Sequence, residues 1–147
     1  MRISQFTDYS LRLLILAAAR APGMITVGEV ADAYGISRNH LTKVAHELGR
    51  AGYLATVRGR GGGLKLAIPA ESIRIGRLVK LCESDSTFVE CFDSKTNRCA
   101  ITPVCQLAHA LAHAESAFYQ DLDAHTLADL VPDRHGVLSA LGYSQPV

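Results

Sequence analysis

The stretch at residues 4–20 constrains the fold most strongly, because apolar side chains surround nearly the whole helix that it predicts. Its apolar residues are Phe6, Leu11, Leu13, Leu14, Ile15, Leu16 and the alanines at 17–19. Such a helix must be covered on most sides, so we expect it at the centre of the fold. The stretch also carries Asp8 and Arg12 and lacks the basic start, apolar middle and small-residue cleavage site of a signal peptide. We therefore expect a cytoplasmic protein.

Two short helices joined by a turn are predicted next. A capping-box pattern at residues 26–29 opens a helix through about Ala33, and a glycine-containing turn follows. Ser37 caps a second helix through about Arg50, with an apolar inner face: Leu41, Val44, Ala45 and Leu48. Gly52 terminates this helix. The pair forms a helix-turn-helix pattern.

The outer face of the second helix is polar near its N-terminus, the end that a helix-turn-helix presents to base edges in the major groove. A merely solvated helix face has the same polarity. The hairpin that follows favours the nucleic-acid interpretation. We predict DNA contacts from six residues: Ser37, Arg38, Asn39, His40, Thr42 and Lys43.

A hairpin with a flexible basic tip is predicted after this helix. Residues 54–57 and 64–68 form the expected strands, and Arg58-Gly59-Arg60-Gly61-Gly62-Gly63 joins them. Glycines let the backbone approach a ligand, and the arginines reach phosphate or the narrow minor groove, whereas a P-loop would need a Gly-Lys-Ser/Thr ending. A plain hairpin is the alternative. We predict a DNA-binding wing that uses Arg58, Arg60 and Gly61.

The net charge of +1 conceals two halves of opposite sign. Residues 1–68 hold nine Lys/Arg against four Asp/Glu, a balance of +5, whereas residues 69–147 hold six against ten, a balance of −4. No basic amphipathic segment or apolar stretch of membrane-spanning length accompanies this split, so it favours nucleic acid over a membrane. With 48% hydrophobic residues, the 147 residues suffice for one domain or two small lobes sharing a core.

Three more helices are predicted in the second half. Ser72 caps one through about Glu83 that places Cys82 in the core, and residues 126–131 form a short capped helix. A long helix from Pro103 to about Asp121 carries an apolar seam: Val104, Leu107, Leu111, Ala114 and Phe118. Packing within the chain is one interpretation of this seam. Because helix-turn-helix proteins usually read two half-sites as dimers, we predict a dimerisation helix.

Three cysteines lie within a fifteen-residue stretch: Cys91, Cys99 and Cys105. Their spacing matches neither the knuckles of a zinc ribbon nor the close-set run of a ferredoxin, which leaves a loop that clips a metal. Unrelated thiols or a structural disulfide are the alternatives, but structural disulfides are uncommon in the cytoplasm. An iron-sulfur cluster is the leading hypothesis, ahead of zinc. Thr102-Pro103 predicts a helix start that puts Cys105 in the first turn.

Taken together, these features resemble a known family. The string Phe6-Thr7-Asp8-Tyr9-Ser10-Leu11-Arg12, the winged helix and the three cysteines before a long helix are similar to the iron-sulfur winged-helix regulators of the IscR/NsrR family over about residues 1–130. The N-terminal string resembles the nitric-oxide-sensing branch. That resemblance implies a dimeric repressor with a 4Fe-4S cluster, which loses DNA affinity when nitric oxide attacks the cluster.

The IscR-like branch is less similar to this chain. It lacks the N-terminal string and places a histidine three residues after the last cysteine, where this chain has Ala108, and His109 lies one position late. The first gap between cysteines is also longer here than in many relatives.

Three cysteines leave one iron of a 4Fe-4S cluster without a protein ligand. The resemblance implies that Asp8 of the partner subunit is the fourth ligand, and a carboxylate is harder and more exchangeable than a thiolate. Arg12 would support the cluster by holding Asp8 through a charge-assisted hydrogen bond. An ordinary surface ion pair between the two is the alternative. The other candidates for the fourth ligand are His109, Glu90, Asp93, water and a small thiol.

The expected fold is mainly α, with a winged helix-turn-helix DNA-binding region at residues 1–68 that includes a two-stranded wing. Residues 69–147 are expected to hold the cluster-binding loop and the dimerisation helices. We predict a homodimeric transcriptional repressor, not an enzyme, that binds a palindromic double-stranded operator, senses nitric oxide and does not bind membranes. The cofactor is expected to be a 4Fe-4S cluster, with 2Fe-2S as the alternative.

Two other functions remain open from the sequence. The nearer one is an iron-sulfur-supply or redox-sensing regulator of the IscR type on the same scaffold. The other is a small iron-sulfur redox protein, although neither a nucleotide-binding glycine motif nor a CxxC pair accompanies the cysteines.

Overall fold

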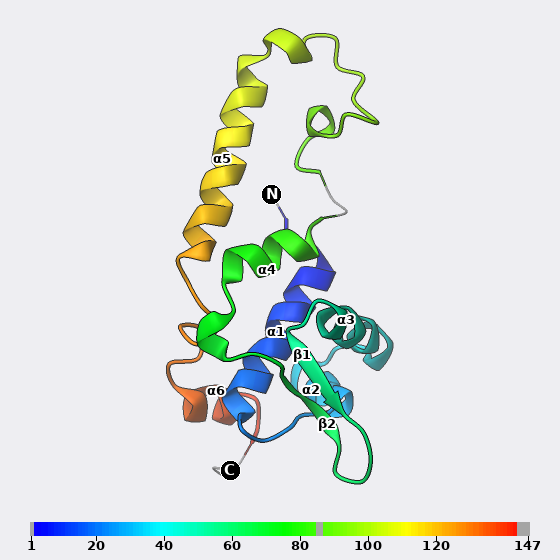
Figure 1. Cartoon of the computed structure of the whole chain (residues 1–147), viewed down its shortest axis with the longest axis vertical. Coiled ribbons are helices and arrows are strands. Elements are labelled where there is room, and N and C mark those ends of the chain that lie inside the picture. Colours follow the sequence, from blue (N-terminus) through cyan, green and yellow to red (C-terminus); the bar gives the residue numbers. More distant parts are fainter. Residues whose placement is uncertain (1, 85–86, 144–147) are drawn as a thin grey trace.

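The computed structural model describes residues 2–84 and 87–143, and it is mainly α-helical with one two-stranded sheet (Figure 1). The helices and strands are, in chain order, α1 (Gln5–Arg20), α2 (Val27–Tyr34), α3 (Arg38–Arg50), β1 (Leu54–Val57), β2 (Gly63–Leu66), α4 (Ile75–Cys82), α5 (Gln106–Asp123) and α6 (Arg134–Ala140). Short 3-10 helices lie at η1 (Ala70–Ser72), η2 (Glu90–Phe92) and η3 (Thr102–Val104). This architecture confirms the predicted fold class. None of the helices described is long and apolar enough to cross a membrane.

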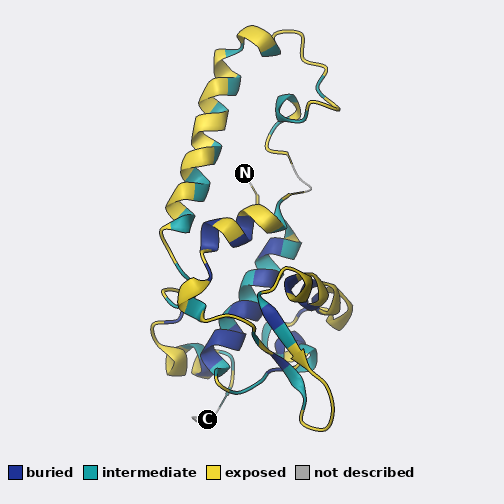
Figure 2. Cartoon of the chain, viewed as in Figure 1, coloured by how far each residue is buried: buried dark blue, intermediate teal, exposed yellow. Residues whose placement is uncertain are grey.

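Helix α1 is the centre of the body, as its apolar circumference predicts. Leu13, Leu14 and Leu16 have no exposed surface, and α2, α3, α4, α6 and β2 all contact the helix (Figure 2). Its N-terminus is capped by Ser4, whose hydroxyl accepts a hydrogen bond from the Thr7 N–H at 3.1 Å. At its other end, the Arg134 guanidinium donates to the carbonyl oxygens of Ala18 and Ala21. Both ends of α1 are therefore fixed by side chains.

Helices α2 and α3 form the predicted helix-turn-helix. The capping box is present at the start of α2: the Glu29 N–H donates to Thr26 Oγ1 at 3.1 Å, and the Thr26 N–H donates to Glu29 Oε2 at 2.6 Å. Gly35 ends α2 in the left-handed conformation. Ser37 occupies the N-cap of α3, but its side chain makes no capping hydrogen bond, which corrects the prediction that it caps this helix. The buried face of α3 is the predicted one.

The wing is an antiparallel hairpin whose register runs from Leu54 opposite Leu66 to Val57 opposite Gly63. Strand β2 ends at Leu66, two residues before the predicted end. Ile25 extends the pairing beyond the hairpin, because it exchanges two main-chain hydrogen bonds with Leu64 at 2.9 and 2.7 Å. A Cβ atom at Gly63 would lie 2.6 Å from the Ile25 carbonyl oxygen, so this close approach requires glycine.

Helix α4 begins at Ile75, after η1, and not at the predicted Ser72. Helix α5 begins at Gln106, because Thr102 and Pro103 start the separate 3-10 helix η3; Cys105 is consequently the N-cap of α5 and does not lie in its first turn. The C-terminal part of α5 packs on α4 at Gly76. A Cβ atom there would lie 2.3 Å from the Tyr119 carbonyl oxygen, so the two helices approach too closely for any side chain.

The predicted helix at residues 126–131 is wrong, since this stretch is a turn. Thr126 and Asp129 satisfy one another: the Thr126 N–H donates to Asp129 Oδ2 at 2.7 Å, and the Asp129 N–H donates to Thr126 Oγ1 at 3.3 Å. The helix near the C-terminus is instead α6, which the sequence did not predict. Asp133 caps α6 by accepting from the Gly136 N–H at 2.9 Å, and Leu138 is buried in the core.

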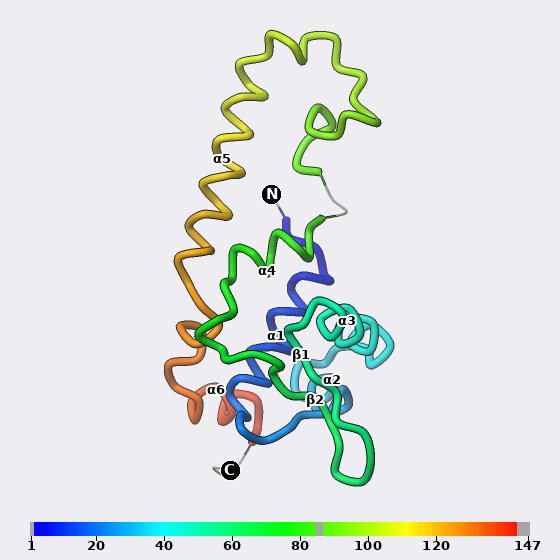
Figure 3. Tube along the Cα trace, viewed as in Figure 1, coloured from blue at the N-terminus to red at the C-terminus, as the bar shows by residue number. Residues whose placement is uncertain are grey.

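The path of the chain separates the cysteines from the wing. After α4 the chain runs through the residues 87–105 and returns along α5, at the end of the molecule opposite the wing and α6 (Figure 3). Most of α5 is exposed, and no residue of this helix is buried. The two functional regions predicted from the sequence therefore lie at different ends of the fold.

Replacing Gly76 by alanine tests the α4–α5 contact. We expect Gly76→Ala to lower the free energy of unfolding by about 1–3 kcal/mol, because the added methyl group cannot fit without moving α5. Gly49→Ala is the matched control, since a Cβ atom there meets nothing nearer than the Leu54 carbonyl oxygen at 3.8 Å. Removing a helical glycine at that position should stabilise the protein by about 0.5–1 kcal/mol. Urea unfolding midpoints measure both changes, and equal midpoints for the two variants would contradict the packing described.

Candidate functional site

The polar face of α3 is exposed over its whole N-terminal half. The six residues predicted to contact DNA all lie on the surface, whereas Leu41 and Val44, which alternate with them, are buried against the body: the six are Ser37, Arg38, Asn39, His40, Thr42 and Lys43. The helical period of 3.6 residues produces this division, because positions three or four apart share one face. The structure thus brings the six predicted side chains onto one exposed surface.

Two contacts hold the start of α3 against the other helices, and one hydrogen bond lies within α3 itself. Arg38 Nη2 lies 3.3 Å from Asp32 Oδ1 of α2, in an exposed ion pair. The Thr42 hydroxyl donates to the Arg38 carbonyl oxygen at 2.8 Å. The His40 ring stacks on Tyr9 of α1, with ring centroids 6.3 Å apart and an interplanar angle of 29°. This last contact had no signal in the sequence, because it joins helices that are distant along the chain.

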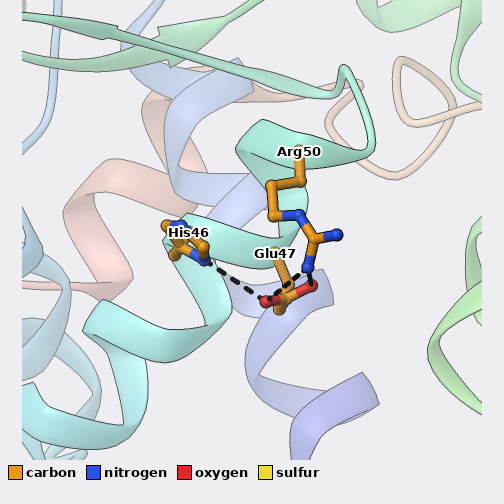
Figure 4. Close-up of polar contacts among 3 residues, drawn as sticks. All are labelled: His46, Glu47 and Arg50. Atoms are coloured by element: carbon orange, nitrogen blue, oxygen red, sulfur yellow. Dashed lines mark hydrogen bonds and ion pairs between the residues drawn. The ribbon is translucent and has the colours of Figure 1, made fainter.

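The C-terminal half of α3 has its positive charge locally compensated (Figure 4). Glu47 Oε1 lies 3.2 Å from His46 Nδ1, and Glu47 Oε2 lies 3.2 Å from Arg50 Nη1. The hydrogen bond with His46, with a further contribution from Arg50, lowers the pKa of the Glu47 carboxyl group. The Glu47 carboxylate offsets the Arg50 charge. This leaves the N-terminal half of α3 as the better surface for a polyanion.

The wing tip adds two exposed arginines to this surface. Arg58 and Arg60 are exposed, and the intervening and following glycines have φ values of +105° at Gly59 and +77° at Gly61. These values favour glycine and allow a tight, narrow tip. In the part of the chain that the structure describes, no acidic side chain pairs with Lys43, Arg58 or Arg60. Their charges are available to phosphate groups.

The three clustered cysteines are free thiols at separate points of the 87–105 segment. Cys91 lies in η2 and is half-buried, Cys99 is exposed, and Cys105 is the N-cap of α5, where its Sγ accepts from the Ala108 N–H at 3.4 Å. Within residues 2–84 and 87–143, no three His, Cys, Asp or Glu side chains lie close enough together to hold a metal ion. A single chain thus carries the thiols without gathering them around one point.

Side-chain hydrogen bonds organise this segment internally. Glu90 Oε1 accepts from the Arg98 N–H at 2.8 Å, and Asn97 Nδ2 donates to the Thr102 hydroxyl at 3.1 Å. Asp93 accepts from the Lys95 N–H and the Thr96 hydroxyl, both at 2.9 Å, and these bonds, the main-chain one first, lower the pKa of Asp93. Glu90 and Asp93, two alternative candidates for the fourth ligand, are already engaged in holding the loop together.

The donor chemistry of the segment suits a thiolate-bound cluster. Three free cysteines offer soft ligands of the type that iron-sulfur clusters and zinc prefer. The remaining cysteine differs from them: Cys82 is half-buried against the core, and burial is the main cause that raises the pKa of its thiol. Cys82 was predicted to lie in the core, and the structure packs it against the core with part of its surface still exposed.

Asp8 is half-buried on α1, and it joins no group of three possible metal ligands within the described residues. Arg12 holds both of its carboxylate oxygens, since Nε donates to Oδ1 and Nη2 pairs with Oδ2, each at 3.0 Å. The same guanidinium lies 5.7 Å from the ring centroid of Tyr34, at the end of α2. Arg12 therefore connects Asp8 to the helix-turn-helix. His109, the other nominated side chain, is exposed on α5.

Three large apolar side chains around the start of α5 are exposed to solvent. Ile101 is 60% exposed, Val104 75% and Leu107 66%. Val104 and Leu107 belong to the seam predicted for dimerisation, whereas Ile101 was missed because it precedes the periodic pattern. Large apolar side chains exposed so close together along the chain make the start of α5 a candidate interaction site, because small soluble proteins rarely expose large apolar patches.

An exposed recognition helix, a basic wing and a central helix that supports both define a winged helix-turn-helix transcriptional regulator. The chain belongs to the Rrf2 family, described as iron-dependent transcriptional regulators, whose model matches residues 3–133. It is 46% identical to the HTH-type transcriptional regulator NsrR of Bacillus subtilis (strain 168), over 96% of this chain and 97% of that protein. It is 44% identical to the NsrR of Geobacillus kaustophilus (strain HTA426), with the same coverage.

Solved structures with the same fold include other members of this group of regulators. IscR of T. potens has a TM-score of 0.73 at 22% identity, covering 93% of this chain and 90% of that one. The oxidised form of Staphylococcus aureus CymR has a TM-score of 0.69 at 28% identity, covering 90% and 98%. The relatives are transcriptional regulators, which confirms that the chain is not an enzyme. The resemblance to the IscR/NsrR regulators is also confirmed.

The four cysteines should differ in their reactivity toward iodoacetamide. In metal-free protein at about pH 8, we expect Cys99 to be alkylated well before Cys82, because Cys99 is exposed and the raised pKa of Cys82 lowers its thiolate fraction. Raising the pH should speed the labelling of Cys82. Peptide mass spectrometry measures each site, and labelling in urea is the control, since unfolding should remove the difference. Equal rates in the folded protein would contradict the placement of Cys82.

Proposed function

We propose that this chain is a homodimeric repressor that binds a palindromic double-stranded operator and senses nitric oxide through a 4Fe-4S cluster. Its ligands would be Cys91, Cys99, Cys105 and Asp8 of the partner subunit. One observation carries the proposal: a single chain combines a recognition surface on which Lys43, Arg58 and Arg60 pair with no acidic side chain of the described residues with three free thiols on a separate segment. The similarity to the NsrR regulators of Bacillus and Geobacillus supports the choice of nitric oxide as the signal. Such a regulator acts in the cytoplasm.

Residues 1–68 would supply the DNA contacts. The N-terminal half of α3 enters the major groove, as in other proteins of this architecture, and the wing arginines reach phosphate or the minor groove. Ser37, Asn39, His40 and Thr42 offer hydrogen-bonding groups to base edges. Arg38, Lys43, Arg58 and Arg60 offer positive charge, and Gly61 lets the wing backbone come close.

Residues 69–147 would hold two copies together and carry the cluster. Ile101, Val104 and Leu107 become buried when a second copy covers α5, and each Å² of apolar surface so removed from water contributes about 25 cal/mol. Two recognition helices in a fixed relation then match two half-sites of the operator. The state of the cysteine-bearing segment at residues 87–105 can alter the relative position of the two recognition helices, because this segment leads directly into α5.

Asp8 offers a direct route from the cluster to the DNA-binding surface. When bound, the cluster supplies iron that reacts with nitric oxide. Arg12 holds Asp8 and also lies over Tyr34 of α2, while the neighbouring Tyr9 stacks on His40 of the recognition helix. A shift of Asp8 therefore reaches the helix-turn-helix through two contacts. A coupling free energy of about 1–3 kcal/mol between the sites would change DNA affinity roughly 5- to 150-fold.

Anaerobic purification followed by iron and sulfide analysis tests this function most directly. We expect about four irons and four sulfides per chain and an absorption spectrum that nitric oxide abolishes, with a parallel loss of affinity for an operator selected from a randomised duplex pool. Alanine at Cys99 should remove the cluster, and alanine at Cys82 should not. A protein with zinc in place of iron and sulfide, or a cluster indifferent to nitric oxide, would contradict the proposal. If the cluster is indifferent to nitric oxide but DNA binding still depends on the iron supply, the protein is a regulator of the IscR type.

The salt dependence of operator binding should identify the phosphate contacts. We expect Arg60→Ala and Lys43→Ala each to reduce the slope of log affinity against log salt by about one unit if they contact phosphate. A lost base contact should instead cost about 1–3 kcal/mol on the selected operator and little on other DNA. Arg50→Ala is the matched control, because its charge is already offset by Glu47 (Figure 4). Unchanged binding in an Arg60→Ala, Lys43→Ala double variant would contradict this surface.

A mixed dimer decides whether Asp8 acts across the subunits. One chain carries Asp8→Ala, and the other has alanine at all three clustered cysteines, so the remaining cluster site has the first chain's thiols and the second chain's aspartate. We expect the wild-type spectrum, because this site keeps its full ligand set. A spectrum identical to that of the Asp8→Ala homodimer would show that Asp8 does not act across the interface. If Asp8 serves only as a surface ion pair with Arg12, its removal should cost about 0–1 kcal/mol of stability and leave the spectrum unchanged.

A further inference from the structure

The Arg38 guanidinium lies along one face of α2, across the turn that joins this helix to the recognition helix. Its Nη2 atom donates to both carboxylate oxygens of Asp32, at 3.3 and 3.4 Å. A Cβ atom at Gly28 would lie 3.5 Å from Arg38 Cζ, so the guanidinium also lies directly beside the first turn of α2. Gly28 and Asp32 share one face of their helix, because they are one turn apart. Two points on α2 thus define where the guanidinium lies.

Arg38 differs in this respect from the other basic residues of the recognition surface. Among the described residues, no acidic side chain pairs with Lys43, Arg58 or Arg60. Arg38 instead has a carboxylate partner, and this partner comes from a different helix. Because the pair joins α2 to α3, it fixes the direction of the arginine relative to the whole helix-turn-helix. The difference predicts a different kind of contact with DNA.

The ion pair leaves Arg38 able to bind a base edge. A guanidinium has five N–H donors, and each of the two hydrogens of Nη2 belongs to a different fork of two parallel donors. Since the two oxygens of one carboxylate are close together, a single hydrogen of Nη2 points to Asp32. The fork that contains the other hydrogen has no acceptor among the described residues, and the side chain is 67% exposed. Guanine presents two acceptors, O6 and N7, that such a fork fits.

The Asp32 carboxylate makes a phosphate a poor partner for this arginine. A phosphate group that approached the guanidinium would be repelled by the carboxylate on its other side, so the two charges of the pair nearly cancel. The O6 and N7 atoms of guanine carry no formal charge, and they accept from the fork without this repulsion. Water screens the pair in the free protein, whereas DNA that covers it removes water and strengthens the attraction between the two side chains. Asp32 therefore favours a base over the backbone.

We propose that Asp32 is a positioning residue for DNA recognition, which holds the Arg38 guanidinium toward a guanine in the major groove and keeps it from the phosphates. The inference rests on the proposed function, because it requires the N-terminal half of α3 to enter the major groove. An arginine that is held before binding loses less rotational freedom when it contacts the base. Gly28 leaves room for it, since a branched side chain there would occupy the place of the guanidinium. The assignment gives the operator a required guanine in each half-site.

Binding to operators with one varied base pair tests the assignment. We expect the operator that the wild-type dimer selects from a randomised duplex pool to contain a guanine whose replacement lowers affinity roughly 5- to 150-fold. Arg38→Ala should remove this preference. Asp32→Ala should weaken it, while affinity for unrelated DNA rises and the salt dependence steepens by about one unit per subunit, because the released arginine reaches phosphate. Asp32→Asn is the matched control: its amide oxygen still accepts from the arginine, so the guanine preference should remain although the charge is lost.

A double-variant cycle separates positioning from a general effect of charge. In the Arg38→Ala background, Asp32→Ala should still raise the affinity for unrelated DNA, because a negative charge near the DNA is gone, but it should not alter the base preference. A change in base preference that persists without Arg38 would overturn the inference, as would a wild-type preference in the Asp32→Ala protein. Gly28→Val should weaken the guanine preference without altering any charge, and Gly28→Ala, whose Cβ makes only an ordinary contact, should not. Urea midpoints close to that of the wild type show that the fold is kept.

An operator with 7-deazaguanine at the same position reads out the guanidinium fork directly. This base lacks the N7 acceptor and keeps O6, so it should lower the affinity of the wild-type dimer and leave that of Arg38→Ala unchanged. An equal loss in both proteins would overturn the inference. Specific operator binding in which no guanine depends on Arg38 would also overturn it and would leave the proposed function standing. A wild-type dimer that prefers no DNA sequence would instead contradict the proposed function itself, so the two failures are distinguishable.

Discussion

Burial of α1 on most of its circumference is the constraint on which the rest of the structure depends. Completely burying side chains such as Leu13, Leu14 and Leu16 contributes about 1.5–3 kcal/mol each, and α1 is contacted by α2, α3, α4, α6 and β2. The helix-turn-helix, the wing, α4 and α6 are therefore positioned mainly by their packing against α1. Any contact on the remaining surface of α1 is held by the same core.

One buried polar side chain sets the orientation of the first turns of α1. The Thr7 hydroxyl donates to Glu83 of another element, whereas the Ser10 hydroxyl donates at 2.7 Å to the Phe6 carbonyl oxygen within α1 and turns with the helix. A rotated helix would lose the Thr7 bond, and an unpaired buried hydroxyl costs roughly 1–3 kcal/mol. With Thr7 and Ser10 facing inward, Asp8 and Arg12 lie on the half-buried outer face. The inward residues thereby decide where the proposed ligand is presented.

Local sequence signals predicted most of the fold. The capping box at Thr26 and Glu29, the apolar period of α3 and the glycine-rich tip between two apolar runs each act over a few residues, and each corresponds to an observed element. The predictions failed where side-chain hydrogen bonds or tertiary contacts, and not the local sequence pattern, determine the structure. Thr126 and Asp129 satisfy each other within a turn, and α6 is too short to show a period but is fixed by Arg134 against the end of α1.

The candidate site was less predictable than the fold for a physical reason. Cysteine spacing identifies which thiols share a segment but not how far apart their sulfur atoms lie, and within the described residues no three possible metal ligands lie together. The exposed polar positions of α3 follow from its period, whereas the Tyr9–His40 stack and the Ser4–Thr7–Glu83 contact join residues far apart along the chain. No periodic or capping pattern encodes such pairs.

The free energies of these tertiary contacts lie in the range that a regulatory switch needs, whereas rearranging the core would cost more. A stacked pair such as Tyr9 and His40 contributes about 0.5–1.5 kcal/mol, and a cation over an aromatic ring at an exposed site, such as Arg12 over Tyr34, contributes about 0.5–1 kcal/mol. Together they match the roughly 1–3 kcal/mol that allosteric coupling usually requires. Removing even one core leucine would cost about 2–5 kcal/mol, enough to endanger folding. The proposed switch can therefore act at the periphery of α1 while the buried helix stays in place.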